Sequence, residues 1–216
     1  MKKTSLPIAI AVPLAVLFVT GALSGCVGVA AVGVGTAVMS SVDRRTTGTQ
    51  VEDEGIELRV TNRISERFGD RVHVNVTSYN RNVLLTGEVP DEKAKAEIEK
   101  ITLGVANARG VTNELQVAGG SSLSSRASDT TITGKVKARF LDANRFNVLS
   151  IKVVTEASVV YLLGIVTEQE AADAVEIART TGGVRKVVKV FEYCKLTDAI
   201  CAPPAPAKPK AEEQKK

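Results

Sequence analysis

Apolar residues recur at helical spacing in two parts of this chain. Ile56, Val60 and Ile64 lie four residues apart, so one face of a helix would carry all three. The same spacing returns 76 residues further on. There the apolar positions are Ile132, Val136 and Phe140. The pattern predicts two equivalent amphipathic helices and therefore an internal repeat.

Each of these helices is followed by a predicted strand hairpin. In the first repeat Val72, Val74 and Val76 alternate with polar residues, as in a strand with one buried face. A polar turn at residues 80–82 leads into a second apolar run over residues 83–89. The matching strands of the second repeat follow at an offset of 77, which one inserted loop residue explains.

A second helix and a third strand complete each repeat. Pro90 opens that helix in the first repeat, and Thr167 with Glu170 fits a capping box in the second. Apolar runs over residues 111–117 and 184–190 supply the third strands. Both repeats therefore have the order α-β-β-α-β. This order predicts an α+β fold, in which two helices cover one face of a three-stranded mixed sheet.

Composition marks the boundaries of the repeats. Gly and Ser between the repeats, and Pro, Ala and Lys at the end, are typical of flexible chain. The predicted segments are a signal peptide over residues 1–25, a Gly/Ala-rich linker over 26–50, the first repeat over 51–118, a Gly/Ser linker over 119–127, the second repeat over 128–193 and a disordered tail over 194–216.

The amino terminus has the composition of a secretory signal. Lys2 and Lys3 precede an almost uncharged apolar run over residues 6–23. The tetrapeptide LSGC, which ends at Cys26, closes this run and resembles the lipobox of bacterial lipoproteins. The resemblance implies cleavage before Cys26, a diacylglycerol on its thiol and an acylated amino end.

Two other interpretations of this segment stay open. One is a plain signal peptide with a chance cysteine, and the other is an uncleaved anchor helix, since about 20 apolar residues can cross a bilayer. Under the lipoprotein interpretation, several acyl chains on Cys26 hold the protein at a membrane. Val27 stands where Asp would retain such a lipoprotein in the inner membrane. The resemblance therefore implies lipid anchoring in the outer membrane, facing the periplasm.

Net charge argues against a nucleic-acid partner. The whole chain carries +4, and removal of Lys2 and Lys3 with the signal leaves +2, which is too small to indicate nucleic-acid binding. The charge is unevenly distributed, because residues 52–68 carry −2 whereas residues 126–152 carry +4. An electrostatic function is therefore expected from the opening helix of the second repeat.

The residues offer little for catalysis. His73 is the only histidine, and strand alternation places it on the polar face, where a surface residue is expected. The chain has no GxSxG, HExxH or phosphate-binding loop, so we predict a protein that is not an enzyme and has no cofactor or metal site. Cys194 and Cys201 could form a disulfide in an oxidising compartment. Two free thiols in a flexible tail are the open alternative.

Four sequence segments resemble BON domains. They are LLTGEV and GVTNELQV in the first repeat, and LLGIVTEQEAA and GGVRKVVKV in the second. Two such units behind a lipobox resemble the dual-BON outer-membrane lipoproteins, from the lipobox to about Tyr193. The tail with Cys194 and Cys201 is not part of that pattern.

The resemblance also implies a function, because the first helix of the second domain in such lipoproteins is implicated in binding anionic phospholipid. Phosphatidylglycerol, cardiolipin and the outer-membrane bilayer are the implied partners, and support of outer-membrane integrity the implied role. Lys135 and Arg139 are expected to share an exposed helix face. Thr131 replaces an expected aromatic residue, which either weakens membrane affinity or moves the contact to Leu141 and Phe146. The candidate phospholipid-binding residues are Thr131, Lys135, Val136, Lys137, Arg139 and Leu141.

Two alternatives concern other partners. The first is an adaptor that binds the outer-membrane assembly machinery or cell-wall enzymes, through the acidic helix over residues 52–68 or an exposed sheet edge. The second is contact between the basic tail over residues 203–216 and anionic cell-wall polymers. The packing of the two repeats against each other is not determined by these patterns.

Overall fold

The computed structural model describes residues 43–202, which belong to one compact unit. The predicted signal peptide, the lipidation of Cys26, most of the Gly/Ala-rich linker and residues 203–216 lie outside the described residues. Within the described part, none of the helices is both long enough and apolar enough to span a bilayer.

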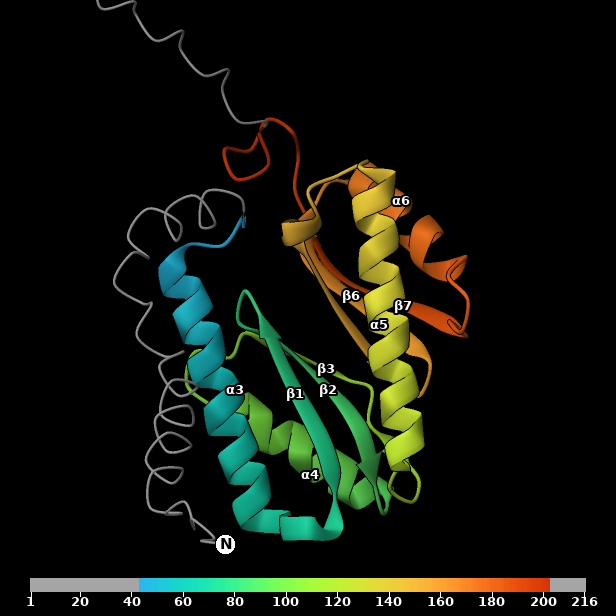
Figure 1. Ribbon diagram of the computed structural model, residues 1–216. Coiled ribbons are helices and arrows are strands. Elements are labelled where there is room, and N and C mark those ends of the chain that lie inside the picture. Colours follow the sequence, from blue (N-terminus) through green and yellow to red (C-terminus); the bar gives the residue numbers. More distant parts are fainter. Residues whose placement is uncertain (1–42, 203–216) are drawn as a thin grey trace, which may run out of the picture. The chain divides into compact units, whose positions relative to one another are not determined.

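The first repeat has a mixed sheet packed against two helices (Figure 1). Strand β2 is central, antiparallel to β1 and parallel to β3 and β4. The elements are α3 (Thr47–Phe68), the 3-10 turn η5 (Gly69–Arg71), β1 (His73–Tyr79), β2 (Asn82–Val89), α4 (Glu92–Leu103), β3 (Gly110–Asn113) and β4 (Gln116–Val117).

The second repeat has the same order of elements. Strand β6 is central, antiparallel to β5 and parallel to β7. The elements are α5 (Leu123–Ala143), the 3-10 turn η6 (Val148–Ser150), β5 (Ile151–Glu156), β6 (Val159–Val166), α6 (Glu168–Arg179) and β7 (Lys186–Tyr193). The predicted α+β fold with mixed sheets is confirmed, as is the capping box at the start of α6.

The third strand of the first repeat differs from the prediction. One strand over residues 111–117 was expected, but the structure divides it into β3 and β4. The side chain of Asn113 causes the break, because its amide donates to the Lys95 carbonyl at 3.2 Å and to Glu99 at 2.8 Å. Its oxygen also accepts from the Leu115 N–H, and the turn places the Leu115 side chain in the core with 1% exposure.

Each repeat has its own apolar core between helices and sheet. The helix faces predicted from spacing are confirmed, since Ile56, Val60 and Ile64 are buried among the first repeat's core residues. Ile132, Val136 and Phe140 are buried in the second.

A third apolar cluster joins the two sheets on the faces that the helices leave uncovered. Both faces of β2 and β6 are consequently buried along nearly their whole length. The two repeats therefore share an apolar interface, which the sequence left undetermined. The cluster consists of Tyr79, Leu84, Val159, Tyr161, Leu163, Ile165 and Cys201.

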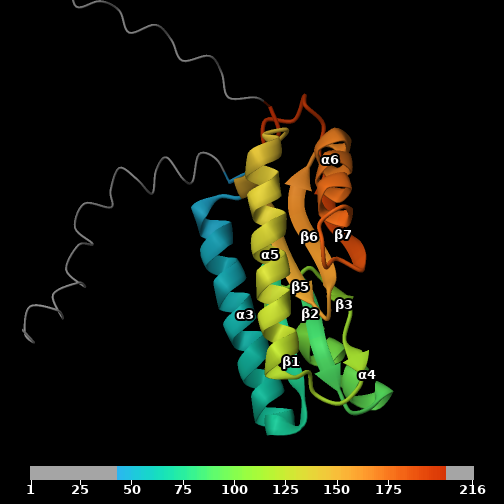
Figure 2. The same ribbon diagram turned by 45° about the vertical axis from the view of Figure 1, so that its right-hand side comes forward.

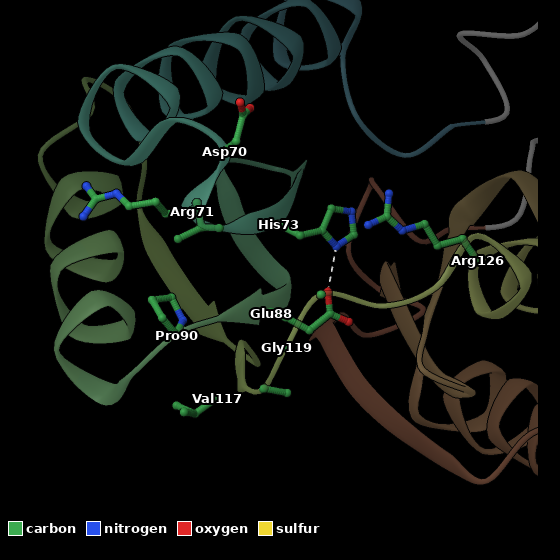
Figure 3. Close-up of a pocket in the computed structure, with 11 residues that line it drawn as sticks. Asp70, Arg71, His73, Glu88, Pro90, Val117, Gly119 and Arg126 are labelled. Carbon is green, nitrogen blue, oxygen red and sulfur yellow. Dashed lines mark hydrogen bonds and ion pairs between the residues drawn. The ribbon is translucent and has the colours of Figure 1, made fainter.

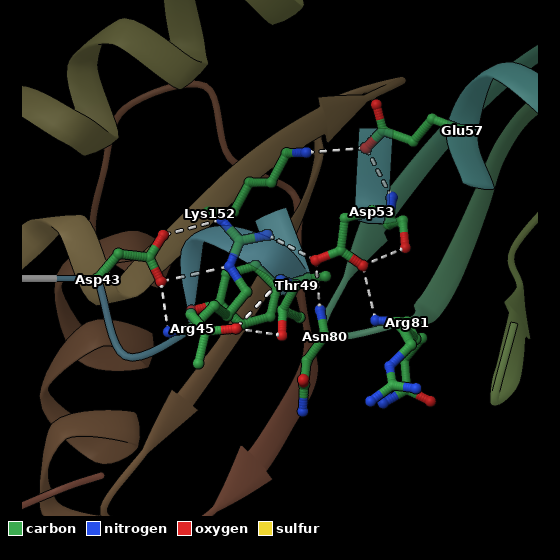
Figure 4. A network of polar contacts seen from close by, with 12 residues as sticks. Asp43, Arg45, Thr49, Asp53, Glu57, Asn80, Arg81 and Lys152 are labelled. Atoms are coloured by element: carbon green, nitrogen blue, oxygen red, sulfur yellow. Dashed lines mark hydrogen bonds and ion pairs between the residues drawn. The ribbon is translucent and has the colours of Figure 1, made fainter. Parts of the chain in front are cut away.

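A buried aspartate near the start of each long helix binds the hairpin turn of its repeat. Asp53 accepts hydrogen bonds from the N–H groups of Asn80 and Arg81 at 2.8 and 2.6 Å, as Figure 4 shows. Both turn residues have positive φ, at 51° and 68°. Asp129 accepts equivalent bonds from the N–H groups at the second turn, residues 157–158, at 2.9 and 2.8 Å. These carboxylates fix each helix to its sheet.

Both predicted linkers are shorter in the structure, because their polar residues cap helices. The linker over residues 26–50 ends at Thr46, whose hydroxyl accepts from the Thr49 N–H at 3.1 Å and starts α3. The Gly/Ser linker over residues 119–127 ends at Ser122, which starts α5 in the same way. Ser and Thr are favoured at this position because they satisfy a free backbone donor.

Two arginines before α3 attach this segment to both repeats. Arg44 donates to both oxygens of Glu170 at 2.7 and 2.8 Å, and to the Ile165 carbonyl at 2.8 Å. Burial alone would raise the pKa of Glu170, but the Arg44 hydrogen bonds and charge, with a backbone hydrogen bond, lower it. Arg45 pairs with Asp53 at 2.9 Å. Ion pairing therefore orders these residues, which were predicted to lie in a linker.

The start of the tail is also ordered, contrary to the predicted disorder from residue 194 onward. Cys194 and Cys201 form a disulfide with 6.2 Å between their Cα atoms, which decides between the two alternatives left open. Cys201 is only 2% exposed, because it packs into the cluster between the sheets. Burial and the covalent bridge hold the residues up to 202 against the second repeat.

Candidate functional site

Helix α5 carries the candidate residues, and Figure 2 shows its whole length, with strands of the second sheet to its right. Its apolar stripe faces inward, and Val136 on that stripe is fully buried in the core. Val136 therefore holds the helix on the sheet and does not reach the surface. Thr131 is exposed, and its hydroxyl donates to the Ala127 carbonyl at 3.0 Å.

Two lysines of α5 carry free positive charge. Lys135 and Lys137 are exposed, and within residues 43–202 neither forms an ion pair or a side-chain hydrogen bond. Their ammonium groups keep their full hydration and can exchange it for contact with an anion. This is the part of the predicted cationic face that the structure places on the surface.

Arg139 differs from the two lysines, because its guanidinium binds the end of α6. Its Nη1 donates to the Ile177 carbonyl at 2.9 Å and to the hydroxyls of Thr180 and Thr181 at 3.0 and 2.9 Å. A cation at this position satisfies carbonyl groups that the helix end leaves free. Lys135 and Arg139 lie one turn apart on α5, as predicted, but only Lys135 is fully exposed, and the arginine has a structural contact.

The remaining cations of residues 126–152 are mostly paired. Arg145 contacts Asp173 at 3.1 Å, and Lys152 contacts Glu57 of the first repeat at 3.0 Å. Figure 4 shows the second of these pairs beside the Asp53 network. The net charge of this segment thus overstates the positive charge that a ligand could meet.

A groove of about 370 Å³ lies beside Lys137 and Leu141. Leu141 is 64% exposed, and Leu149 on the opposite rim is 49% exposed. Sequence reasoning missed Leu149, because it falls in the η6 turn and outside any helical or strand period. The lining residues are Arg45, Tyr79, Lys137, Phe140, Leu141, Val148, Leu149, Ile151 and Lys152.

The first repeat contributes Arg45 and Tyr79 to this groove. The Arg45 guanidinium lies 4.0 Å from the centre of the Tyr79 ring. Burial, followed by the charge of Asp43, raises the pKa of Tyr79 to about 12, so its hydroxyl stays protonated at neutral pH. The groove therefore has an aromatic wall from one repeat and an apolar wall from the other.

Phe146 lies against the core and contributes little to the surface. Its ring packs edge-on against Phe140 with 5.0 Å between the ring centres, and its side chain is half-buried. Of the two residues proposed to replace the missing aromatic residue at Thr131, only Leu141 projects into solvent.

His73 does not lie on an open surface as predicted. It is half-buried, and its Nδ1 lies 2.8 Å from an oxygen of Glu88. The alternation of apolar and polar residues along β1 was predicted correctly. The polar face, however, turns toward the second repeat and not toward open solvent. Asn75 on the same face donates to Glu156 of the second repeat at 2.6 Å.

Comparisons with known proteins agree with this architecture. Residues 52–119 and 128–195 each match the BON domain family. The chain is 37% identical over 173 residues to the outer membrane lipoprotein DolP of Haemophilus influenzae, a match that covers 79% of this chain and 90% of that protein.

Two further relatives are more distant. The 21 kDa hemolysin of Actinobacillus pleuropneumoniae is 32% identical over 154 residues, with 70% of this chain and 79% of the relative covered. The osmotically-inducible protein Y of Escherichia coli is 29% identical over 157 residues, with 71% and 77% covered. Since both repeats match one family model, the chain belongs to the BON domain family and carries two BON domains in tandem.

Proposed function

We propose that this protein is a lipid-anchored envelope protein that binds anionic phospholipid through α5 and supports the outer membrane. The observation that carries the proposal is Lys137, an exposed lysine without an ionic partner that lines the groove together with the exposed Leu141. Lys135, which is also exposed and without an ionic partner, lies on the other flank of α5. The lysines would contact lipid phosphates, and Leu141 and Leu149 would enter the interface. No catalytic step is part of this function.

The expected free energies of membrane binding are small, so the contact needs a protein that is already tethered to the membrane. Each lysine near an anionic surface contributes about 1 kcal/mol, and full burial of a leucine about 1.5–3 kcal/mol. These contributions give weak binding to a free protein, but an acyl anchor at Cys26 would make the contact intramolecular and so raise its occupancy. The lipobox and the relative named outer membrane lipoprotein DolP support anchoring in the outer membrane.

An adaptor function has one observation in its favour. Val51 and Leu58 of α3 are 64% and 62% exposed, and their spacing of seven residues places them on one side of this acidic helix. Such a pair could contact an apolar and basic surface of another envelope protein. The vesicle experiment below separates this function from lipid binding, because an adaptor would not require anionic lipid.

The proposed function predicts that reversing two charges on α5 removes vesicle binding. Unacylated protein should sediment with phosphatidylglycerol or cardiolipin vesicles but not with phosphatidylcholine vesicles, and added salt should reduce the bound fraction. Lys135→Glu combined with Lys137→Glu should weaken binding at least 10-fold. Arg139 is left unchanged, because its substitution would also disturb α6.

The matched control is Lys93→Glu with Lys100→Glu, which makes the same change in net charge on the exposed side of α4. This variant should retain most of the binding, since α4 lies in the first domain. Equal losses in both double variants would show that bulk charge alone determines binding, and unchanged binding of the α5 variant would exclude α5 as the site.

A further inference from the structure

Three side chains with metal-ligand chemistry converge where the two domains meet. They are His73 of β1, Glu88 of β2 and Glu156 of β5, and one ligand atom from each lies within 4.8 Å of the others. Figure 3 shows the contact between His73 and Glu88 at the edge of a pocket. An imidazole nitrogen and two carboxylates from three different strands form a mixed donor set.

The two carboxylates are buried without a matching positive charge. Glu88 and Glu156 are 7% and 6% exposed, and within residues 43–202 neither forms an ion pair with a lysine or arginine. Even a protonated His73 would leave one negative charge uncompensated. Buried carboxylates in this arrangement favour a bound cation or a shared proton.

At the opposite end of the interface, different residues stand at the positions equivalent to the trio. The strand registers pair Val74 with Gly87 and Ile151 with Gly164, so the two hairpins superimpose residue by residue. His73, Glu88 and Glu156 are thereby equivalent to Ser150, Ile165 and Tyr79.

None of these three equivalent residues carries a charge. The Tyr79 hydroxyl donates to the Ser150 carbonyl at 3.3 Å, and Ile165 is packed in the cluster between the sheets. Charged contacts at that end, such as Lys152 with Glu57, are formed by other residues. The trio therefore has two buried carboxylates at positions that hold neutral residues at the equivalent place.

A small ion could reach the trio from solvent. His73 and Glu88 line a pocket of about 610 Å³ that also includes Arg126. Arg126 forms no ion pair with either glutamate, and its Nε donates to Ser121 at 3.2 Å. Figure 3 shows the His73 ring between Glu88 and Arg126.

We propose that His73, Glu88 and Glu156 bind a divalent transition-metal cation, with Zn²⁺ as the best-matched ion, and that this site joins the two BON domains. Imidazole and carboxylate are both ligands of Zn²⁺, at about 2.0–2.2 Å. Tetrahedral ligands at that range lie roughly 3.3–3.6 Å apart, so side-chain movements of about 1 Å complete the site. The cation would bind Nδ1 of the neutral imidazole, whose proton is then carried by Nε2, and water would fill the fourth position.

The test is a zinc titration of the full chain, purified in detergent and stripped with a chelator. Calorimetry should show one Zn²⁺ per chain, and the midpoint of thermal unfolding should rise with added zinc. Co²⁺ should bind with a visible absorption spectrum typical of nitrogen and oxygen ligands. His73→Ala and Glu156→Gln should each weaken zinc binding at least 10-fold and remove the spectrum. His73 is the only histidine in the chain, so no second imidazole can replace it.

Two controls separate ligation from disturbance of the interface. Tyr79→Phe removes the hydrogen bond at the equivalent end and should leave zinc affinity unchanged. Glu156→Gln removes a buried charge, so it should fold with an unfolding midpoint at least equal to that of the wild type without metal. Absence of stoichiometric zinc binding, or binding that persists in both ligand variants, would overturn the proposal. Neither result depends on membrane binding.

Discussion

Gly87→Ala should prevent stable folding of the first BON domain. Gly87 has a φ of +114°, and a Cβ atom built there would lie 2.0 Å from the carbonyl oxygen of His73 on the neighbouring strand. The three nearest atoms are all backbone atoms of His73 and Val74, which no rotamer change can move, so we expect a loss above about 4 kcal/mol, a size that single substitutions rarely reach. Gly164 in the second domain shares the close approach, with 2.5 Å from its Cβ position to the Ser150 carbonyl oxygen, but not the positive φ.

Denaturant unfolding followed by circular dichroism would measure this effect. Gly134→Ala is the control, because nothing lies within 4 Å of its Cβ position in the middle of α5. That change should stabilise the protein by about 0.5–1 kcal/mol through helix propensity. A Gly87→Ala protein that unfolds at the same midpoint as wild type would show that the hairpin can shift to admit a side chain.

Asp53→Ala should be the second most damaging change. The Asp53 carboxylate is 2% exposed, accepts from the backbone N–H groups of Asn80 and Arg81 and from the Ser78 hydroxyl, and pairs with Arg45. Its removal leaves buried donors without acceptors, which costs about 3 kcal/mol or more in total.

The same unfolding experiment tests this prediction, with exposed Asp70 replaced by alanine as the control. Asp70→Ala should change the free energy of unfolding by no more than about 0.5 kcal/mol, as is usual for surface positions. Asp53→Asn should fall between the two, because the amide oxygen still accepts one hydrogen bond. Equal stability of Asp53→Ala and wild type would mean that water or other groups replace the carboxylate.

The fold could be predicted from sequence where one period dominated. Spacing of four placed Ile56, Val60 and Ile64 in the core, and alternation located the hairpin that begins with β1. Both periods follow directly from the geometry of helices and strands, so a few consecutive residues are enough to identify them. The capping box at Thr167 was identified for the same reason, because the whole motif lies within four residues.

The packing of the domains could not be predicted from alternation alone. The polar positions of β1, such as His73 and Asn75, look like a solvent-facing side. His73 contacts Glu88 on the neighbouring strand, but Asn75 contacts Glu156, 81 residues further along the chain. One signal was available, because the uninterrupted apolar run of β6 over residues 159–166 is typical of a strand buried on both faces. The apolar run alone does not show which other surface of the protein covers the second face of β6.

The candidate site was identified by helix and by charge, but not residue by residue. Lys137 and Leu141 were both candidate residues, and the structure places them together beside a groove that the sequence did not predict. Charge counting treated Arg139 as equivalent to Lys135, whereas Arg139 binds the end of α6. Long cationic side chains reach several partners, and tertiary structure decides which one each takes.

The central claim is that α5 meets the membrane, and a depth measurement tests it most directly. A nitroxide at Leu141→Cys in the unacylated protein, with Cys26 replaced by serine, would be compared with one at Leu103→Cys, an exposed position on α4. Cys194 and Cys201 are bonded to each other and should not take the label. With phosphatidylglycerol vesicles, we predict that the label at 141 becomes protected from a water-soluble relaxation agent and more accessible to oxygen, while the label at 103 stays in water. Two labels that both remain in water on vesicle-bound protein would contradict the account.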